Sequence, residues 1–320
     1  MRGVVIGAVI AVAAAVLAAA GCSSGGGSTL DAAAGDGSPA TTSAKTSASP
    51  STSPSLSPSS GSHPDSATSD PAKPSAAAPA GSVTPPPLGV KWDYQIGGAY
   101  PPPAGVRIVS RDSSASPASG LYNICYLNAF QAQPDATDWW QSNHPDLLLK
   151  TSSGAPVIDQ NWNEQLLDVS TDAKRTAIAQ IVGGWMAGCA AKGYQGVEPD
   201  NLDSYSRSQG LLTADDDAAL ATQLARLAHA KGLAIAQKNT AEFLPRAHQI
   251  GFDFAVTEQC GKYGECGGYA STFADHVVDV EYDDAGFAKA CQGYAGKIAI
   301  VLRDLDVSPA GSSSYAYKTC

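Results

Sequence analysis

Acidic side chains follow two strand-like runs of the sequence, and their types suit the cleavage of a glycosidic bond. Glu198-Pro199-Asp200-Asn201 ends the run Gly196–Asp200, and Glu258-Gln259 ends the apolar run Phe252–Glu258. A helix cap would not need all three polar groups around Pro199, so we expect these three residues to form part of a functional site. Of two facing carboxyl groups, one can protonate the leaving oxygen while the other attacks the anomeric carbon or activates water. Crowding of like charges raises the pKa of one member, which suits it to act as the acid.

Other polar residues stand at the ends of further strand-like runs. If the strands are parallel, these side chains converge on one pocket together with Glu198, Asn201 and Gln259. Each could instead cap the helix that follows, and this explanation serves Asp168 and Asn239 equally well. The set comprises Asp112, Asp168, Asp203, Lys238, Asn239, Glu281 and Tyr282.

Other classes of chemistry lack their usual residues. The five histidines form no pair at metal-ligand spacing, and residues 88–320 contain no Gly-x-Ser-x-Gly elbow, phosphate loop or dinucleotide fingerprint. We therefore expect neither a metal nor a cofactor.

The hydrophobic periodicity alternates between strands and helices and predicts a (β/α)₈ TIM barrel. One helix is expected over Thr171–Lys192, ending at Gly193, and another starts at Thr213 and stops at Gly232. Repeated β-α-β units indicate a parallel sheet, whose site lies at the carboxyl ends of the strands. Lys91–Ile96 is a ninth strand candidate, and the sequence does not decide which of the nine is extra. The other eight are Val106–Asp112, Leu121–Leu127, Leu166–Ser170, Gly196–Asp200, Leu233–Lys238, Phe252–Glu258, Val277–Tyr282 and Lys297–Arg303.

The N-terminal third predicts export and attachment to a membrane. Arg2, an apolar run and small residues before Cys22 resemble a lipoprotein signal, which implies residues 1–22 as signal peptide and a lipid on Cys22. The alternative is a plain signal peptide or a membrane-spanning helix. Residues 23–87 are rich in Ser, Pro, Ala and Thr, and we expect a disordered tether that leads to a hydrolase domain over 88–320. The protein would then lie on the outer face of a bacterial cell membrane and contact the membrane only through its lipid.

The globular segment is acidic. The chain has 20 Lys and Arg against 30 Asp and Glu. The first 87 residues contain three of the basic and four of the acidic residues, so residues 88–320 contain 17 basic and 26 acidic residues. Nucleic acid is an unsuitable partner for such a surface, whereas a neutral or cationic substrate suits it. Acidity that merely keeps a secreted protein soluble is an equal explanation. We expect a monomer.

Six cysteines remain besides Cys22, and an even number in an oxidising compartment favours disulfides. Cys260 and Cys266 enclose a short Gly-rich segment and are expected to pair. The pairing of Cys125, Cys189, Cys291 and Cys320 cannot be read from the sequence, although Cys125–Cys189 and Cys291–Cys320 are the natural choice.

Several motifs together resemble glycoside hydrolase family 114, whose members are endo-α-1,4-polygalactosaminidases and spherulin-4-like proteins. The resemblance runs from about Val90 to Asp306. It departs at Arg111-Asp112 and at Asn161-Trp162-Asn163-Glu164, in loops that shape the cleft. The motifs are Trp92-Asp93-Tyr94-Gln95, Cys125-Tyr126, Gly196-Val197-Glu198-Pro199-Asp200-Asn201, Lys238-Asn239, Phe252–Cys260, Tyr263-Gly264-Glu265-Cys266 and Val280-Glu281-Tyr282.

The resemblance implies a (β/α)₈ barrel and retaining cleavage of α-1,4-linked galactosamine polymers. It implies catalytic roles for Asp200, taken as nucleophile, and Glu258, taken as acid/base, although the order of these two roles stays open. Trp92, Tyr126 and Tyr282 could stack on sugar rings or meet an ammonium group, or they could pack in the barrel core. A non-catalytic sugar-binding protein of this fold and a glycosidase for another α-linked polymer are the rival hypotheses. The exact polysaccharide and its acetylation stay open.

Overall fold

Eight parallel strands form the centre of the computed structural model, which describes residues 83–320. They follow one another around the sheet in chain order, and β1 contacts β11, so the sheet curls into a nearly closed barrel. β12 (Tyr317–Thr319) pairs antiparallel with β11 outside this series. The eight are β1 (Lys91–Gln95), β2 (Val106–Asp112), β3 (Tyr122–Asn128), β7 (Gly196–Asp200), β8 (Ala234–Lys238), β9 (Phe254–Glu258), β10 (Val277–Glu281) and β11 (Ala299–Arg303).

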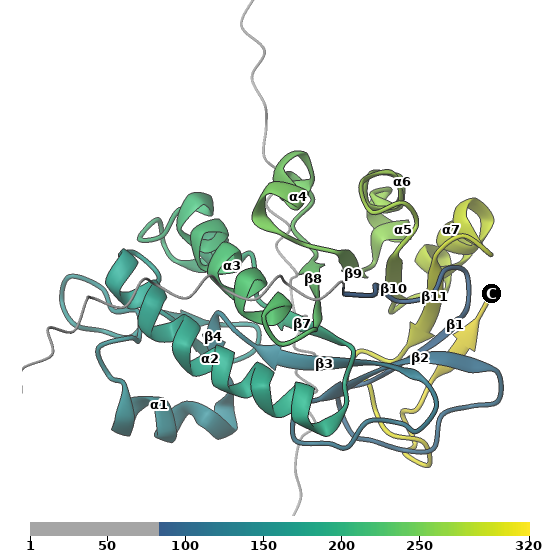
Figure 1. The fold of residues 1–320 in the computed structure, drawn as a ribbon, viewed down its shortest axis with the longest axis horizontal. Helices are drawn as coiled ribbons and strands as arrows, with labels where there is room; N and C mark the ends of the chain where they lie inside the picture. Colours follow the sequence, from purple (N-terminus) through teal and green to yellow (C-terminus); the bar gives the residue numbers. More distant parts are fainter. Residues whose placement is uncertain (1–82) are drawn as a thin grey trace, which may run out of the picture. The chain divides into compact units, whose positions relative to one another are not determined.

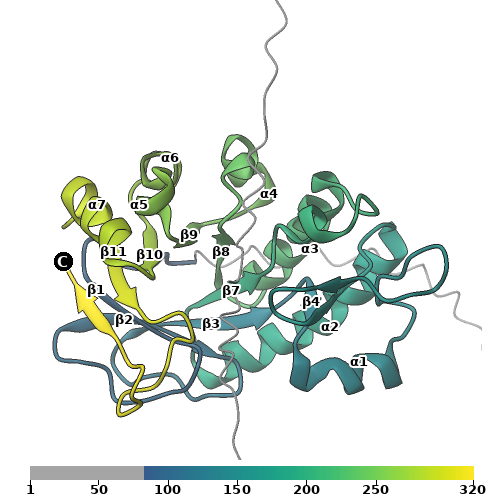
Figure 2. The same ribbon diagram turned by 180° about the vertical axis from the view of Figure 1, so that it is seen from behind.

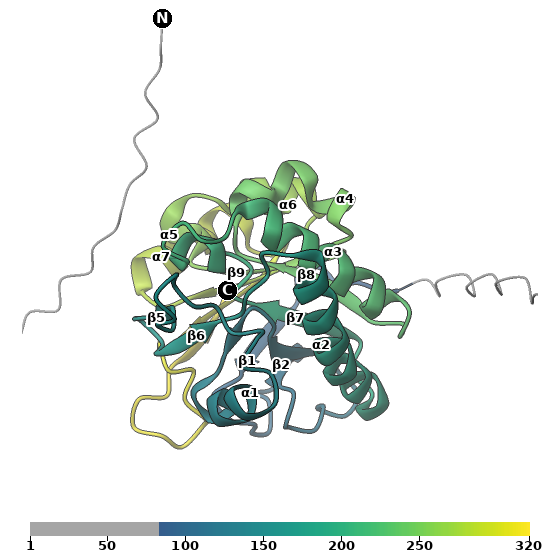
Figure 3. The same ribbon diagram turned by 90° about the vertical axis from the view of Figure 1, so that its left-hand side faces the viewer.

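Helices surround only part of the barrel (Figure 1). The connections after β1 and β2, residues 96–105 and 113–121, contain no helix, and none follows β11 in the described residues, whereas at least one helix lies between each later barrel strand and the next. Figure 3 views the strands with the helices in an arc around them. The α-helices are α1 (Thr137–Asn143), α2 (Asp172–Lys192), α3 (Ala214–His229), α4 (Ala247–Ile250), α5 (Cys260–Tyr263), α6 (Cys266–Thr272) and α7 (Asp284–Tyr294). Short 3₁₀ helices cover Pro134–Ala136, Ser204–Arg207 and Ala241–Arg246.

The ends of the two long helices follow from local side-chain chemistry, as expected from the sequence. The Thr171 side chain accepts a hydrogen bond from the Lys174 backbone at the start of α2, and Gly193 ends that helix in the left-handed conformation, with φ 94°. Thr213 and Asp216 form a capping box at the start of α3.

A small second sheet interrupts the barrel between β3 and β7. It consists of β4 (Gln131–Ala132), β6 (Glu164–Leu166) and β5 (Ile158–Asp159), paired antiparallel in that order. Figure 2 shows β4 beside α1 and α2, at the end of the molecule to which the β3 arrow points. Of the nine strand candidates, Leu166–Ser170 is therefore the one that is extra to the barrel. Its first residue ends β6, whereas Lys91–Gln95 is one of the eight barrel strands.

Alternating side chains of the barrel strands separate two apolar regions. Inward residues such as Trp92, Tyr94 and Phe254 fill the barrel, whereas outward residues such as Val197 and Ile235 pack beneath the helices. Thr84 and Pro86 also contact the barrel, because the Thr84 carbonyl accepts a hydrogen bond from the Tyr122 hydroxyl and the Pro86 carbonyl lies 2.8 Å from His276 Nδ1. The packed chain thus begins a few residues before the expected start at Leu88.

All six cysteines in the described part of the chain form disulfides. The expected Cys260–Cys266 pair is confirmed, and the other two bonds, Cys125–Cys189 and Cys291–Cys320, follow the natural choice. The expected signal segment, Cys22 and most of the expected tether lie outside the described residues. Within residues 83–320, no helix combines the length and apolar character that crossing a membrane requires.

Candidate active site

A cavity of about 390 Å³ opens at the carboxyl ends of the barrel strands. The barrel brings together side chains at or near the ends of six of its strands, β2, β3, β7, β8, β9 and β10, and the small sheet adds a further wall. Eight of the expected site residues line this cavity: Asp112, Tyr126, Asp200, Asn201, Asp203, Asn239, Glu258 and Tyr282.

Asp200 is the last residue of β7, and several donors hold its carboxylate in place. Oδ2 accepts a hydrogen bond from the Tyr126 hydroxyl at 2.7 Å, and Oδ1 accepts one from the Asn201 backbone at 2.8 Å. Lys238 Nζ lies 3.2 Å from Oδ1. Burial alone would raise the pKa of Asp200, but the positive charge of Lys238 and these hydrogen bonds outweigh burial, so the pKa lies below its usual value. Asp200 is thereby kept ionised.

Glu258 ends β9 and faces the same cavity, with a third of its side chain exposed (33%). Its Oε1 accepts a hydrogen bond from the Tyr282 hydroxyl at 2.6 Å. Asn239, in the left-handed conformation with φ 45°, accepts from the Glu258 backbone amide at 2.7 Å and donates to Oε2 at 3.4 Å. The backbone and the carboxylate of Glu258 are therefore held by one side chain from the neighbouring strand.

Below the cavity, the Lys238 ammonium group lies between three carboxylates. Its side chain is 2% exposed, and Nζ lies 2.7 Å from Glu198, 3.2 Å from Asp200 and 3.9 Å from Glu258. Burial would lower the pKa of Lys238, but the three carboxylates outweigh burial and hold the pKa well above its usual value. Nζ also donates to the Tyr94 hydroxyl at 3.1 Å. The surrounding carboxylates thus favour the charged form of the ammonium group and hold it in place.

Four expected substrate-binding residues do not line the cavity. Trp92 is fully buried inside the barrel, where its indole donates to Ser110 at 3.2 Å. Glu198 and Lys238 lie below the cavity, and burial raises the pKa of Glu198 despite its contact with Lys238. Gln259 directly precedes α5 and has the left-handed conformation, with φ 62°. Trp92 and Glu198 are therefore part of the support for the site, because their side chains are closed off from the cavity.

The sequence reading missed the wall that the small sheet contributes. Asp159 and Glu164, from β5 and β6, and Arg207, which follows β7, line the cavity. Arg207 Nε lies 2.7 Å from Asp159, and its two other nitrogens bind Asp203 at 2.8 and 2.9 Å. The only signal in the sequence was the loose match over Asn161–Glu164, which indicated a cleft-shaping loop without naming a residue.

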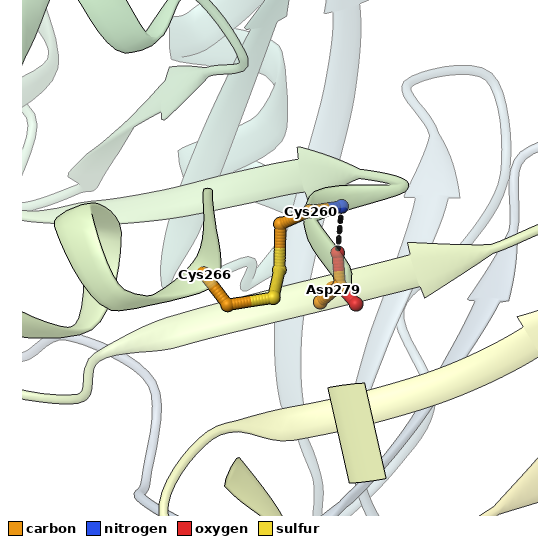
Figure 4. Close-up of side chains that lie close together, drawn as sticks. All are labelled: Cys260, Cys266 and Asp279. Carbon is orange, nitrogen blue, oxygen red and sulfur yellow. Dashed lines mark hydrogen bonds between the residues drawn. A yellow bond between two sulfur atoms is a disulfide. The ribbon is translucent and has the colours of Figure 1, made fainter. Parts of the chain in front are cut away.

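The segment after Glu258 is fastened to the next strand. Figure 4 shows the Cys260–Cys266 disulfide beside Asp279, whose Oδ1 accepts a hydrogen bond from the Cys260 backbone at 3.2 Å. These three residues lie close enough together to suggest a metal site. However, both sulfur atoms are bonded to each other, so they are not thiolate ligands. The group instead holds the chain just beyond Glu258.

Comparisons with known proteins find solved structures with the same fold. Ega3 from Aspergillus fumigatus, solved in complex with galactosamine, has a similar fold, with a TM-score of 0.60 and 22% identity over 76% of this chain and 100% of that one. The glycoside hydrolase domain of PelA from Pseudomonas aeruginosa has a TM-score of 0.50 and 20% identity over 70% of this chain and 97% of that one. None of the curated proteins matches this chain.

The family model described as glycoside-hydrolase family GH114 matches residues 72–320, which include the whole barrel and every side chain of the cavity. This match confirms the resemblance found in the sequence motifs and identifies the chain as a glycoside hydrolase. Because the match covers more than half of the chain, the protein belongs to glycoside hydrolase family GH114.

Proposed function

We propose that the protein is an endo-acting hydrolase that cleaves α-1,4-linked galactosamine-containing polysaccharide. The observation that carries the proposal is the pair Asp200 and Glu258, which face one cavity and share Lys238 beneath it. The acidic walls of the cavity suit a polymer that bears ammonium groups. The galactosamine bound by the structurally similar Ega3 supports the same class of substrate.

In the proposed mechanism, Asp200 is the nucleophile and Glu258 the acid/base. Glu258 gives its proton to the glycosidic oxygen as the bond from that oxygen to the anomeric carbon breaks, and Asp200 Oδ forms an ester with this carbon. Glu258, now a carboxylate, then takes a proton from water, whose oxygen attacks the same carbon and releases Asp200. The lowered pKa of Asp200 favours this order of roles, since a nucleophile must be ionised.

The spacing of the two carboxylates favours retention of configuration. Their nearest oxygens lie 3.2 and 3.9 Å from the same Lys238 nitrogen, so these oxygens are at most about 7 Å apart. Retaining enzymes separate the two groups by about 5–5.5 Å and inverting enzymes by about 6.5–9.5 Å. The limit therefore includes the whole retaining range and only the short end of the inverting range.

The test is a digestion of partly deacetylated α-1,4-galactosamine polymer, acetylated glucosamine polymer and neutral α-galactan side by side. Oligosaccharides should appear in mass spectra only from the first. Asp200→Asn and Glu258→Gln keep the shapes of the side chains, and each should lower turnover by at least roughly 10²–10⁴-fold. Asp203→Asn should cost less, because Asp203 pairs with Arg207 at the cavity edge. Wild-type turnover in Asp200→Asn would refute the mechanism, and equal digestion of neutral galactan would refute the substrate.

We further propose that the mature protein is held at the outer face of a bacterial membrane by a lipid on Cys22. The support is the charged and apolar pattern of residues 1–21 followed by Cys22. Wild-type protein should incorporate radiolabelled fatty acid and sediment with membranes, whereas Cys22→Ser should do neither. Labelled Cys22→Ser would exclude this attachment site.

A further inference from the structure

Glu164 is a buried acid in the cavity wall that the mechanism leaves unused. It begins β6, in the small sheet inserted between β3 and β7, and it lines the cavity although the residue is only 9% exposed. An acid at such depth costs free energy unless its oxygens find partners. The partners of its two oxygens therefore indicate what the residue does.

One of the two oxygens is fully satisfied by amide groups. Asn128 donates to Oε2 at 2.8 Å and Asn201 donates to it at 3.3 Å. Gln131, with its amide oriented to satisfy both of its neighbours, donates to Oε2 at 2.9 Å and accepts from Arg207. Three side chains thus fix the carboxyl group through a single oxygen.

The other oxygen, Oε1, has no partner in the described part of the protein, and it is not among the fully buried atoms that lack one, so it is open to the cavity. No residue in the described part of the chain donates a hydrogen bond to Glu164 Oε1, and none forms a salt bridge with this carboxyl group. The cations nearby are engaged elsewhere. Arg207 pairs with Asp159 and Asp203, and Lys238 pairs with Glu198 and Asp200. Oε1 is therefore a fixed acceptor without a positive partner in the protein.

The electrostatic surroundings of Glu164 disfavour its ionised form. Burial raises the pKa of Glu164 to about 7, and the negative charges of Asp200 and Asp159 add to this effect. The hydrogen bond from Asn128 and the charge of Arg207 oppose it without cancelling it. A bound cation next to Oε1 would supply the stabilisation that the carboxylate lacks.

Glu164 lies on the opposite side of the nucleophile from the proton donor. Asn128 on β3 is in register with Asp200 on β7 and ties Glu164 to that side. Glu258 lies on β9, two strands beyond β7 in the other direction. Glu164 therefore lies on the Asp200 side of the cavity, away from Glu258 in the order of the strands.

We propose that Glu164 determines specificity for free amino groups. Its Oε1 accepts a hydrogen bond from the ammonium group of a galactosamine unit that binds on the Asp200 side of the cavity. This inference rests on the proposed function and deepens it, because it assigns recognition of the deacetylated sugar to one residue. An N-acetyl group carries no charge and has only one N–H to donate, so it gains much less from this contact.

The test compares Glu164→Gln with wild type on two oligosaccharides, fully deacetylated α-1,4-galactosamine oligomer and its N-acetylated counterpart. A hydrogen bond to a charged group contributes enough for a change of about 10- to 100-fold. The variant should lose that factor in kcat/KM for the deacetylated oligomer, mainly through KM, and less than about threefold for the acetylated one. Glu164→Asp, which keeps the charge but withdraws it, should lie between the two.

Asp306→Asn is the matched control, because it removes one charge from an exposed position in the same cavity. It should change the ratio of kcat/KM between the two oligomers by much less than Glu164→Gln does. At an exposed position, solvent and salt screen the interaction of the removed charge with the substrate. Equal losses on both oligomers in Glu164→Gln, or no loss on either, would overturn the inference while wild-type turnover still upheld the proposed function. If wild type cleaved neither oligomer, the proposed function itself would fail.

Discussion

Replacement of Lys238 by methionine tests whether this buried cation organises the site. The substitution keeps a similar length of chain and removes the charge between Glu198 and Asp200. At an effective dielectric constant of about 20, each of these two contacts, at 2.7 and 3.2 Å, represents roughly 5–6 kcal/mol of gross attraction. Burial of the ammonium group offsets much of this attraction, and removal of one partner from a buried ion pair costs about 3–5 kcal/mol. The expected loss in Tm is roughly 6–20 °C.

The sign of the pH dependence follows from what remains after the substitution. Without Lys238, the carboxylates repel each other, and the folded state binds protons more readily than the unfolded state does. The pKa of Glu198, already raised by burial, rises further, so the folded variant loses stability as the pH rises through the range in which this group ionises. The deficit in Tm should therefore be larger at pH 8 than at pH 5. The acidic limb of the kcat/KM profile should move to higher pH, because Asp200 loses the cation that lowers its pKa.

Thermal unfolding followed by circular dichroism at both pH values, together with the pH profile of kcat/KM, measures these effects. Lys289→Met, at an exposed position of α7, is the control and should change stability by no more than about 0.5 kcal/mol. A Tm within about 2 °C of wild type at pH 8, combined with an unchanged acidic limb, would refute the reasoning. It would mean that hydrogen bonds alone hold the carboxylates.

Two further predictions concern the support of the site. Replacement of Cys125 and Cys189 by alanine opens a 64-residue loop and should lower the free energy of unfolding by about 4 kcal/mol. The same change at Cys260 and Cys266, which are six residues apart, should lower it by about 2 kcal/mol. Chemical denaturation measures both losses, and the reverse order would contradict the loop-entropy argument. Tyr282→Phe removes the hydroxyl that donates a hydrogen bond to Glu258, the proposed acid, at 2.6 Å. The variant should lower kcat/KM by about 10- to 100-fold and leave Tm nearly unchanged. Unaltered kinetics would exclude a role for that hydroxyl.

Only the structure decided which of the nine strand candidates is extra to the barrel. Lys91–Ile96 and Leu166–Ser170 were both candidates, and the sequence did not choose between them. In the structure β1 is a barrel strand and Leu166 belongs to the small sheet, so Asp200 and Glu258 end the fourth and sixth barrel strands. A short apolar run looks alike in a barrel and in an inserted hairpin, because both bury it. Only the pairing partners distinguish them.

The sequence by itself determined the eight barrel strands, with one strand candidate too many, the two long helices and the polar residues at the strand ends. Helix caps at Thr171 and Thr213, the apolar alternation of the strands and the six-residue spacing of Cys260 and Cys266 are local signals, and each acts within a few residues. The family motifs named the carboxylates at the ends of β7 and β9. These features were predictable because the residues that cause them are neighbours in the chain.

The tertiary structure alone decided which polar groups face the cavity and which lie beneath it. Glu198 and Asp200 are two residues apart and point the same way, yet Glu198 lies one layer deeper and is closed off from the cavity. Glu164 reaches the same cavity from a separate sheet. Depth inside a barrel and the approach of an inserted sheet depend on contacts between residues far apart in the chain, because burial and charge pairing arise only when those segments meet.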